Sequence, residues 1–370
     1  MSGQGSEHRP HGELRESLSW MPGGEIKGCP ACRRVILSPS QAPDALCPLC
    51  YQAELVPQAG LVRLQPPEIF LPAALSETCV MEVLTAFTEK VPFKVDDLDA
   101  NKMRSRLRLL WWPQWLVDGD LQGQWSGTFG FDYQVKTAHE SYGDSGWQSR
   151  EKVRTETRYL PRMGEITRHY DNLVVPALRD QNLRIGQIGA YDSNKAVLFE
   201  QNAIQNNYVQ MPEIDPQELL EIAQNGLREK GVQDIIKAAA ADRKREVNFE
   251  GDFNNLNWTE FLQPVYTTFY IDDQGKRQVV ALNGQSGKIY GRRMASVQKA
   301  KKLSLILAIL PALALLTAII LSIFSLNPGV IAGMVFVALF AIIFLGLAFI
   351  PWVRASLWNN SENREKADFR

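Results

Sequence analysis

The chain has 370 residues, 45% of them hydrophobic and 22% charged, and its formal net charge is −1 at pH 7. This balance excludes the globally basic surface that attracts nucleic acid. Residues 1–24 are polar and Gly-rich and lack the apolar core of a secretory signal. We therefore expect a disordered tail and no export from the cytoplasm.

Four cysteines form two Cys-Pro-x-Cys pairs, Cys29 with Cys32 and Cys47 with Cys50, and fourteen residues separate the pairs. In each pair the proline restricts φ, and the short loop lets backbone N–H groups point at the thiolates. Four thiolates around one ion make a closed tetrahedral Zn²⁺ site, which is structural because no position is open to a substrate. The spacing predicts a zinc ribbon at residues 25–56, with these cysteines as ligands of one structural Zn²⁺.

Three other interpretations of the cysteines stay open: an iron centre, two disulfides, or four unrelated thiols. Disulfides need an oxidising compartment, which the missing secretory signal disfavours. A fifth cysteine, Cys79, lies in the amphipathic stretch ETCVMEVLTAF, where we expect a buried, inert thiol. His8 and His11 belong to the N-terminal tail, and the four cysteines close the metal shell without them.

A Pro-punctuated linker at residues 57–75 leads to an α+β domain at 76–295. The domain begins with a helix near 76–90 and contains a second helical pattern at 215–245, which glycines weaken in the middle. Strands are expected where β-branched and aromatic residues are frequent between Gly-containing turns, in an antiparallel meander with one solvent-facing side. Their ranges are 131–142, 149–160, 163–175, 261–271, 276–282 and 287–291.

Several residues of this domain could carry chemistry, and each has a simpler structural explanation. Residues 284–288 (GQSGK) lack the spacing and the strand–helix context of a phosphate loop, so they predict a hairpin turn. His139 and His169 are expected to be surface or hydrogen-bonded structural residues. We expect the aspartates to cap turns and the tryptophans to be core residues, with a ligand platform as the alternative for the latter. They are Asp118, Asp120, Asp132, Asp144, Trp111, Trp112, Trp115 and Trp125.

Two basic runs remain in the soluble part. In the first, Lys102, Arg104, Arg106 and Arg108 alternate with other residues, and the second, Arg243–Arg245, is expected to close the helix at 215–245. A solvated face or helix-end charge matching explains both runs. Contact with anionic lipid headgroups is the alternative.

Residues 303–353 contain no charged side chain. A membrane-spanning helix needs about 20 apolar residues, so the segments 303–326 and 330–353 each suffice, and a tight turn joins them. Cationic residues flank the pair on its outer ends, which places both chain termini and a tail at 354–370 on the cytoplasmic side. We expect a multi-pass inner-membrane anchor, because transport usually needs ionisable residues inside the helices. Trp352 and Trp358 suit an interfacial aromatic belt.

Three segments, together with the paired cysteines, resemble the marks of a bacterial family. The segments are WWPQWLVDGD (111–120), ITRHYDNLVVPA (166–177) and ALNGQSGKIYGRR (281–293). The chain resembles zinc-ribbon proteins with two transmembrane helices that often carry the label "primosomal protein N′ (replication factor Y), superfamily II helicase". The resemblance implies a membrane partner of SPFH/band-7, PspA-like and TPM-domain proteins. The sequence does not support the helicase label, since it shows no phosphate loop, acidic metal-binding strand or arginine fingers.

These features predict a membrane-anchored scaffold or adaptor without enzymatic activity. It would contact membrane lipids and dock cytoplasmic proteins of the SPFH/PspA-like type at the inner membrane, with oligomerisation left open. The alternative is a membrane-associated nucleic-acid-binding protein that uses Arg33, Arg34 and the run 102–108, although nucleic acid is not the expected partner. A hydrolase or lipid-modifying enzyme is a third hypothesis. The expected fold class is α+β, with an N-terminal zinc ribbon, an antiparallel-sheet cytoplasmic domain with helices and a C-terminal transmembrane helical hairpin.

Overall fold

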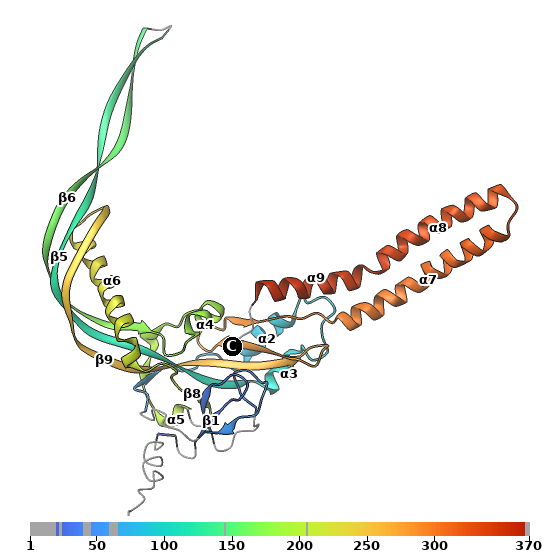
Figure 1. Ribbon diagram of the computed structural model, residues 1–370, viewed down its shortest axis with the longest axis horizontal. Helices are drawn as coiled ribbons and strands as arrows, with labels where there is room; N and C mark the ends of the chain where they lie inside the picture. Colours follow the sequence, from blue (N-terminus) through green and yellow to red (C-terminus); the bar gives the residue numbers. More distant parts are fainter. Residues whose placement is uncertain are drawn as a thin grey trace, which may run out of the picture. The chain divides into compact units, whose positions relative to one another are not determined.

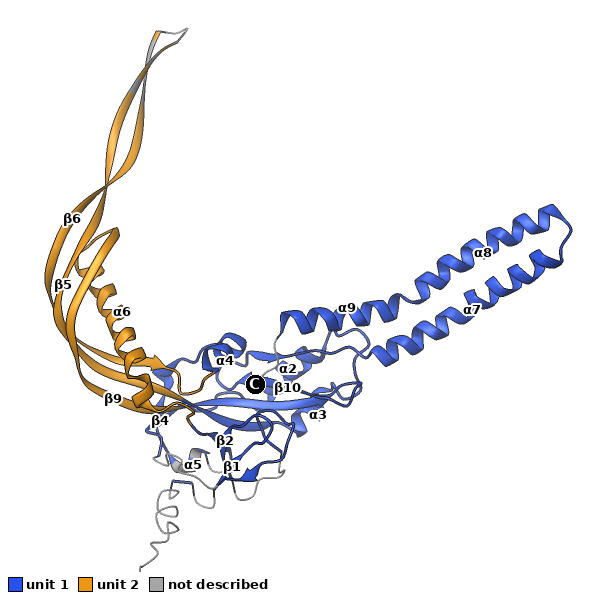
Figure 2. Ribbon diagram, viewed as in Figure 1, with its two compact units in different colours: residues 1–113, 180–211, 262–370 blue, residues 114–179, 212–261 orange. Residues whose placement is uncertain are grey.

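The computed structural model describes residues 20–21, 24–39, 46–58, 66–143, 146–204 and 206–366. It divides into two units (Figure 2): unit 1 comprises residues 1–113, 180–211 and 262–370, and unit 2 comprises residues 114–179 and 212–261. Most of the tail expected at 1–24 lies outside the described residues, as do parts of the ribbon loop and of the 57–75 linker. Two described residues of that tail, Trp20 and Met21, are buried in a hydrophobic core of unit 1.

The strands around the cysteines belong to a larger sheet in unit 1. β1 (Glu25–Gly28) pairs antiparallel with β2 (Val35–Ser38) and with β3 (Val56–Pro57). β2 pairs antiparallel with β8 (Tyr208–Gln210), and β8 pairs in parallel with the first residues of β5 (Arg108–Gly143). The sheet is therefore mixed, and the prediction of an antiparallel sheet is wrong at this pair. Parallel pairing needs a long crossover between strands, and local sequence patterns do not reveal such a connection.

A second part of unit 1 combines antiparallel strands with two helices. The end of β9 (Arg243–Ile271) pairs with β10 (Arg277–Asn283), which pairs with β11 (Ile289–Gly291). Apolar side chains of α2 (Glu77–Thr88) and α3 (Ala100–Ser105) form one core with these strands. The helix predicted at 76–90 and the strands predicted at 276–282 and 287–291 are confirmed, with shifts of one or two residues at their ends.

Short elements complete unit 1. β4 (Ile69–Phe70) pairs with β7 (Val197–Leu198), so part of the predicted linker is a strand. The other short elements are α4 (Gln181–Ile188), the 3₁₀ helix η1 (Ser193–Lys195) and α5 (Gln201–Ile204).

Unit 2 is built on one very long hairpin. β5 pairs antiparallel with β6 (Gly146–Val175) in a register that runs from Trp115↔Val175 to Gly143↔Gly146. The strands predicted at 149–160 and 163–175 are one strand, so the turn expected between them is an error. Among the described strands β6 pairs with β5 alone, so its other edge is free. Proline, which has no backbone N–H to donate, is tolerated at position 161 of such an edge strand.

Helix α6 (Leu220–Ala238), which follows the 3₁₀ helix η2 (Pro216–Leu219), packs on the hairpin within unit 2. Gly226 lies close to Leu173 of β6 and Gly231 close to Leu121 of β5, so a side chain at either position would require the leucine to shift. The two glycines therefore let the helix approach the sheet closely. The low helix propensity of the two glycines can be seen in the sequence. The close packing that offsets it can be seen only in the structure.

The chain changes from helix to strand just after α6. Ala240 adopts a left-handed φ of 49°, and the backbone N–H of Asp242 then donates to a carbonyl of β5. β9 begins at Arg243, so the prediction of a helix over 215–245 is wrong at its end, and the basic run Arg243–Arg245 begins a strand. Pairing with β5 satisfies the backbone groups here and outweighs the helix propensity of the alanine-rich segment.

Two antiparallel helices near the C-terminus, α7 (Val297–Phe324) and α8 (Pro328–Ala348), pack against each other (Figure 1). By length and composition the two helices that span Val297–Phe324 and Pro328–Glu365 could cross a membrane. Their side chains are largely exposed, with Phe324 at 82% and Leu310 at 78%. This exposure differs from that of a core helix in a soluble protein, which is buried.

The helices extend beyond the predicted apolar segments. α7 begins at Val297, before the segment 303–326, and α9 (Ile350–Glu365) continues the second helix after Phe349. The part of the predicted cytoplasmic tail at 354–365 is therefore helical. The polar residues of α9 contact the chain before α7, and no local pattern in the sequence predicts these contacts.

Candidate metal centre

The sulfur atoms of Cys29, Cys32, Cys47 and Cys50 gather in unit 1, all within 4.8 Å of one another. The Sγ–Sγ distance is 3.6 Å between Cys29 and Cys50 and 3.8 Å between Cys32 and Cys47. Sulfurs placed tetrahedrally at about 2.3 Å from a Zn²⁺ ion lie about 3.8 Å from one another. The thiols are free, and these separations are far longer than a disulfide bond of about 2.05 Å. The cluster that the spacing predicted can therefore hold a metal ion.

The two Cys-Pro-x-Cys segments fold in the same way. The residue after each second cysteine is left-handed, with φ of 60° at Arg33 and 52° at Tyr51. Arg33 N donates to Cys29 O at 2.8 Å, and Tyr51 N donates to Cys47 O at 2.9 Å. The N–H of Cys32 points at Cys29 Sγ, 3.5 Å away. The left-handed positions could not be predicted from the sequence, because neither residue is Gly, Asn or Asp.

Four thiols at this distance cannot all ionise without a cation, because each thiolate repels the next. The hydrogen bond with Cys32, then that with Cys50 and burial, raise the pKa of Cys47 far above its usual value. Hydrogen bonds from Cys32 and Cys47 lower the pKa of Cys50 below its usual value. A divalent cation at the centre would supply the positive charge that lets all four thiols ionise. The donor set therefore fits a metal that binds thiolate, and it leaves no open position for a substrate.

Arg34 fastens the first cysteine pair to α4. Its guanidinium donates to both Asp180 oxygens, at 3.3 and 2.8 Å. Asp180 also accepts from Arg184 Nε at 3.0 Å, and Arg184 Nη1 donates to Gln210 Oε1 at 2.9 Å. Arg184 is fully buried, and its guanidinium carbon lies 4.6 Å from the Trp112 ring centroid. One carboxylate shared by two arginines compensates the buried charges and links the metal centre to α4 and β8.

Tyr51 fastens the second cysteine pair to β9 and β10. Its buried hydroxyl donates to Thr267 O at 3.0 Å, and its ring centroid lies 4.7 Å from that of Phe269. Arg277 Nη1 donates to Tyr51 O at 3.1 Å. Burial raises the pKa of Tyr51, so the phenol remains a neutral donor. Both cysteine pairs are thus seated on the sheet of unit 1.

The first basic run is engaged by carboxylates of unit 1. Arg106 donates to both oxygens of Asp97, at 2.6 and 2.9 Å. Arg104 pairs with Glu77 at 2.9 Å, and Lys102 Nζ lies 3.9 Å from Asp97. These contacts agree with a solvated, ion-paired face.

Aspartates that were expected to cap turns lie within strand β5, so that prediction is wrong; they are Asp118, Asp120 and Asp132, while Asp144 lies outside the described residues. Asp120 accepts from Asn255 Nδ2 at 2.7 Å and lies 2.6 Å from His169 Nδ1. His169 Nε2 lies 2.8 Å from Asp171. The hydrogen bond with Asp120 raises the pKa of His169 above its ordinary value. His169 is thus a hydrogen-bonded surface residue, as predicted.

The remaining candidates have plain structural positions. Trp111, Trp112 and Trp115 are buried, as expected of core aromatics, and Trp125 is half-buried. Cys79 is half-buried in the first turn of α2, so the prediction of a buried thiol is wrong in degree. Its backbone N–H donates to the capping Ser76 hydroxyl at 3.2 Å.

A second polar site in unit 1, which sequence reasoning missed, lies where α9 meets the segment before α7. Glu362 is only 5% exposed. It accepts from Arg293 N at 3.0 Å and lies 3.3 Å from Arg293 Nη2 and 2.9 Å from Lys366 Nζ. Arg292 Nε donates to Lys366 O at 2.9 Å. We call this site, residues 291–296 with 358–366, the joint.

Neutral groups extend the joint toward the apolar helices. Asn359 Oδ1 accepts from Ala295 N at 2.7 Å, and Asn359 Nδ2 donates to Ala295 O at 3.0 Å. Trp358 Nε1 donates to Arg293 O at 2.6 Å. Farther along, Trp352 N donates to Ser304 Oγ at 3.2 Å. These contacts bind α9 on one side to the chain before α7 and on the other to α7 itself, so the apolar hairpin is attached to the folded part of unit 1 at both of its ends.

No protein-family model, curated protein or solved structure matches this chain. Function must therefore be inferred from the metal centre, the apolar helices and the joint.

Proposed function

We propose that this protein is a membrane-anchored scaffold that holds a zinc-stabilised domain at the cytoplasmic face of the bacterial inner membrane and docks partner proteins there. The observation that carries the proposal is the exposed apolar hairpin α7–α8, which the joint ties firmly to a folded polar domain. Water does not stabilise so large an apolar surface, whereas a lipid bilayer does. Membrane lipids are therefore the first partner.

Zinc is the proposed ion because the sulfur separations of 3.6 and 3.8 Å match a tetrahedral zinc–thiolate shell. Its role is structural. The ribbon is too short to bury a large core of its own, and a bound ion supplies the missing stability. The contacts of Arg34 with Asp180 and of Tyr51 with β9 support this role, because they attach both cysteine pairs to the folded part of unit 1.

The charge pattern supports a cytoplasmic location for both termini. Cationic residues stay on the cytoplasmic side of a membrane, and they flank the apolar hairpin only on its outer ends: Arg292, Arg293, Lys299, Lys301, Lys302 and Arg354. The short connection Asn327–Gly329 carries no charge and would reach the far side. A reducing cytoplasm also suits four metal-binding thiolates.

Proteins of the SPFH and PspA-like type are the proposed partners, on the strength of the sequence resemblance described above. Catalysis has no part in this proposal. Nucleic-acid binding is the weaker alternative, because several of its expected cations already pair with carboxylates: Arg34 with Asp180, Arg104 with Glu77 and Arg106 with Asp97.

The test is crosslinking of the tagged full-length protein in native membranes, followed by purification and identification of what is recovered. Co-purified SPFH or PspA-like proteins, with no excess absorbance at 260 nm, are the expected result. Recovery of nucleic acid whose binding weakens steeply with salt would instead establish the alternative. Release of the protein from membranes by alkaline carbonate would refute the anchor itself.

A further inference from the structure

The hairpin of unit 2 extends beyond its third strand. β9 begins at Arg243 beside β5, and the residues there close off the pairing: Asp242 N donates to Gly130 O at 3.0 Å, and Asp242 Oδ2 accepts from Asp132 N at 2.8 Å. The next residues of β5, 133–143, pair with β6 on one side, and no other described strand pairs with them. The other edge of β5 is therefore open (Figure 2).

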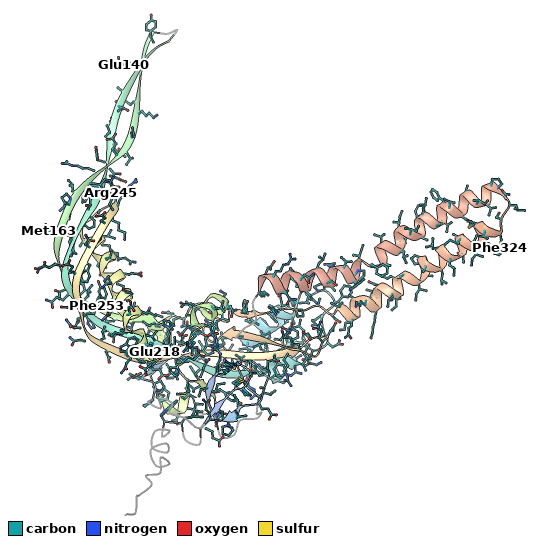
Figure 3. All side chains as sticks on the ribbon, in the orientation of Figure 1. Glu140, Met163, Glu218, Arg245, Phe253 and Phe324 are labelled. Atoms are coloured by element: carbon teal, nitrogen blue, oxygen red, sulfur yellow. The ribbon has the colours of Figure 1, made fainter. Side chains whose placement is uncertain are left out.

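We call the two-stranded part the distal arm; it comprises Tyr133–Gly143 of β5 and Gly146–Glu156 of β6. Figure 3 shows Glu140 far along this arm, beyond Arg245 near the beginning of β9. An isolated two-stranded hairpin is marginally stable in water, and an open edge is a template for another strand. In a single chain the distal arm therefore lacks the third strand that supports the rest of the hairpin in unit 2.

Alternate side chains on the open β5 edge are exposed, and two of them are charged. Gln134, Lys136, Ala138 and Glu140 lie on one face of the strand, and all four are exposed. Among the described residues Lys136 and Glu140 form no ion pair. On the opposite face, the Tyr133 hydroxyl donates to the carboxylate of Glu156 at 3.2 Å. The unpaired charges are of opposite sign and stand symmetrically on either side of Ala138.

We propose that two copies of this chain pair edge to edge through residues 133–143 of β5, antiparallel and centred on Ala138, so that the two distal arms form one four-stranded sheet in the order β6–β5–β5–β6. In this register Lys136 of each copy lies directly opposite Glu140 of the other. Two identical charge pairs result, and the small Ala138 side chains meet at the two-fold axis. This inference does not depend on the proposed scaffold function.

The charges specify this register against its neighbours. Centring the pair on Lys136 would place two lysines opposite each other, and centring it on Glu140 would oppose two glutamates. A shift of one strand relative to the other by a single residue would place the face with Lys136 and Glu140 of one copy on the opposite side of the sheet from that of the other copy, so these charges could not pair. The segment 133–143 contains one lysine, Lys136, and one glutamate, Glu140, whose charges cancel, so two copies do not repel each other. A self-complementary edge of this sort fits a second copy better than an unrelated peptide strand.

The outer edge of β6 does not have this property. Over the same length it carries Arg150, Lys152 and Arg154, three cations within five residues. Self-pairing centred on Lys152 would oppose Arg150 to Arg154 and Lys152 to itself, and like charges across strands are destabilising. The inference is therefore specific to β5.

A charge-reversal cycle on the full-length protein in detergent tests the pairing. Dimer dissociation constants are measured by analytical ultracentrifugation for the wild type, Lys136→Glu, Glu140→Lys and the double variant. Each single reversal turns two attractive contacts into two repulsive ones and should weaken the dimer about tenfold or more. The double variant should restore the wild-type constant. Equal constants for all four proteins, or a monomeric wild type across the accessible concentrations, would overturn the inference.

Crosslinking provides a second measurement that does not depend on charge. In a Cys79→Ser background with metal bound, Ala138→Cys should oxidise to a covalent dimer, because residues opposite each other at the axis are within disulfide range. Val153→Cys is the matched control: it is exposed and pairs with Lys136, but on β6, one strand farther from the axis in each copy. Crosslinking at 153 and not at 138 would assign the contact to the wrong strand. Crosslinking of Ala138→Cys to a different protein, without a homodimer, would equally refute pairing between copies.

Discussion

Two places in unit 1 hold distant parts of the chain together, and they do so by different means. At the metal centre, four thiols come within 4.8 Å and can all ionise only around a cation from outside the chain. At the joint, the buried Glu362 finds its cations, Arg293 and Lys366, within the chain itself. With a metal ion at its centre, the first connection would depend on metal supply, whereas the second needs only groups of the chain itself.

The two places also differ in what surrounds them. The thiols are supported on one side by Arg34, which pairs with Asp180 at the start of α4, and on the other by Tyr51, which contacts β9. The joint lies at the base of the exposed apolar helices and ties α9 to the chain before α7. Loss of the metal should therefore affect the folding of the domain, and loss of the joint should affect mainly its connection to the hairpin.

The largest expected effect follows from removal of the metal. Cys32→Ser, or treatment of the wild type with a strong chelator, should lower the free energy of unfolding of the soluble part by at least about 4 kcal/mol, because loss of a structural metal is among the most damaging changes. Zinc content by mass spectrometry and thermal unfolding by circular dichroism measure the two consequences. Cys79→Ser is the control and should change neither. Equal zinc in Cys32→Ser and the wild type would contradict the assignment.

The joint should show a smaller effect. Glu362→Ala leaves Arg293 and Lys366 without their shared carboxylate and should destabilise the protein by about 2–4 kcal/mol. Glu362→Gln, which keeps an acceptor of the same size, should cost less. The change should also make the 354–366 segment sensitive to protease while the zinc content stays at the wild-type value. A loss of zinc in Glu362→Ala would show that the two places are not independent.

The sequence predicted the metal centre far better than the joint. Cysteine spacing is a local pattern, and four ligands within twenty-two residues can close on one ion with little help from the rest of the chain. The apolar helices were also found, because hydropathy is local. By contrast, Glu362 and Arg293 are separated by 69 residues, and nothing near either residue indicates the other.

The sheet shows the same limit. Strands β10 and β11 follow each other through short turns and were placed correctly, whereas the parallel pair β5–β8 and the unbroken length of β6 were not. Pro161 and Gly164 appear to a local analysis as a turn, but continuous pairing with β5 keeps them in a strand. The run 243–245 was predicted as the end of a helix for the same reason. It begins strand β9 because it pairs with β5, which is distant in sequence.

The supports of the metal centre can be separated from the metal itself. Arg184→Met removes a fully buried guanidinium from Asp180 and Gln210 and should destabilise unit 1 by about 1–3 kcal/mol. Arg34→Met should cost less in stability but should speed the release of zinc to a chelating dye, because Arg34 adjoins the first cysteine pair. If both variants lost zinc at the wild-type rate, the Asp180 network would have no role in holding the centre.

The smallest effect is expected where the same chemistry as in the joint is exposed to water. His169 lies between Asp120 and Asp171 on the surface of unit 2, and its hydrogen bond with Asp120 raises its pKa above the unfolded value of about 6.5. A raised pKa stabilises the fold while histidine is protonated, so the contribution is fully present below the unfolded pKa and is lost as pH rises through the folded one. His169→Gln should therefore unfold more easily than the wild type at pH 6 and equally at pH 9. NMR titration of the ring measures the pKa directly, and an unshifted value would remove this pH dependence. Solvent screens the exposed pair but not Glu362, so a stability difference at His169 as large as that at the joint would mean that burial is not what gives the joint its strength.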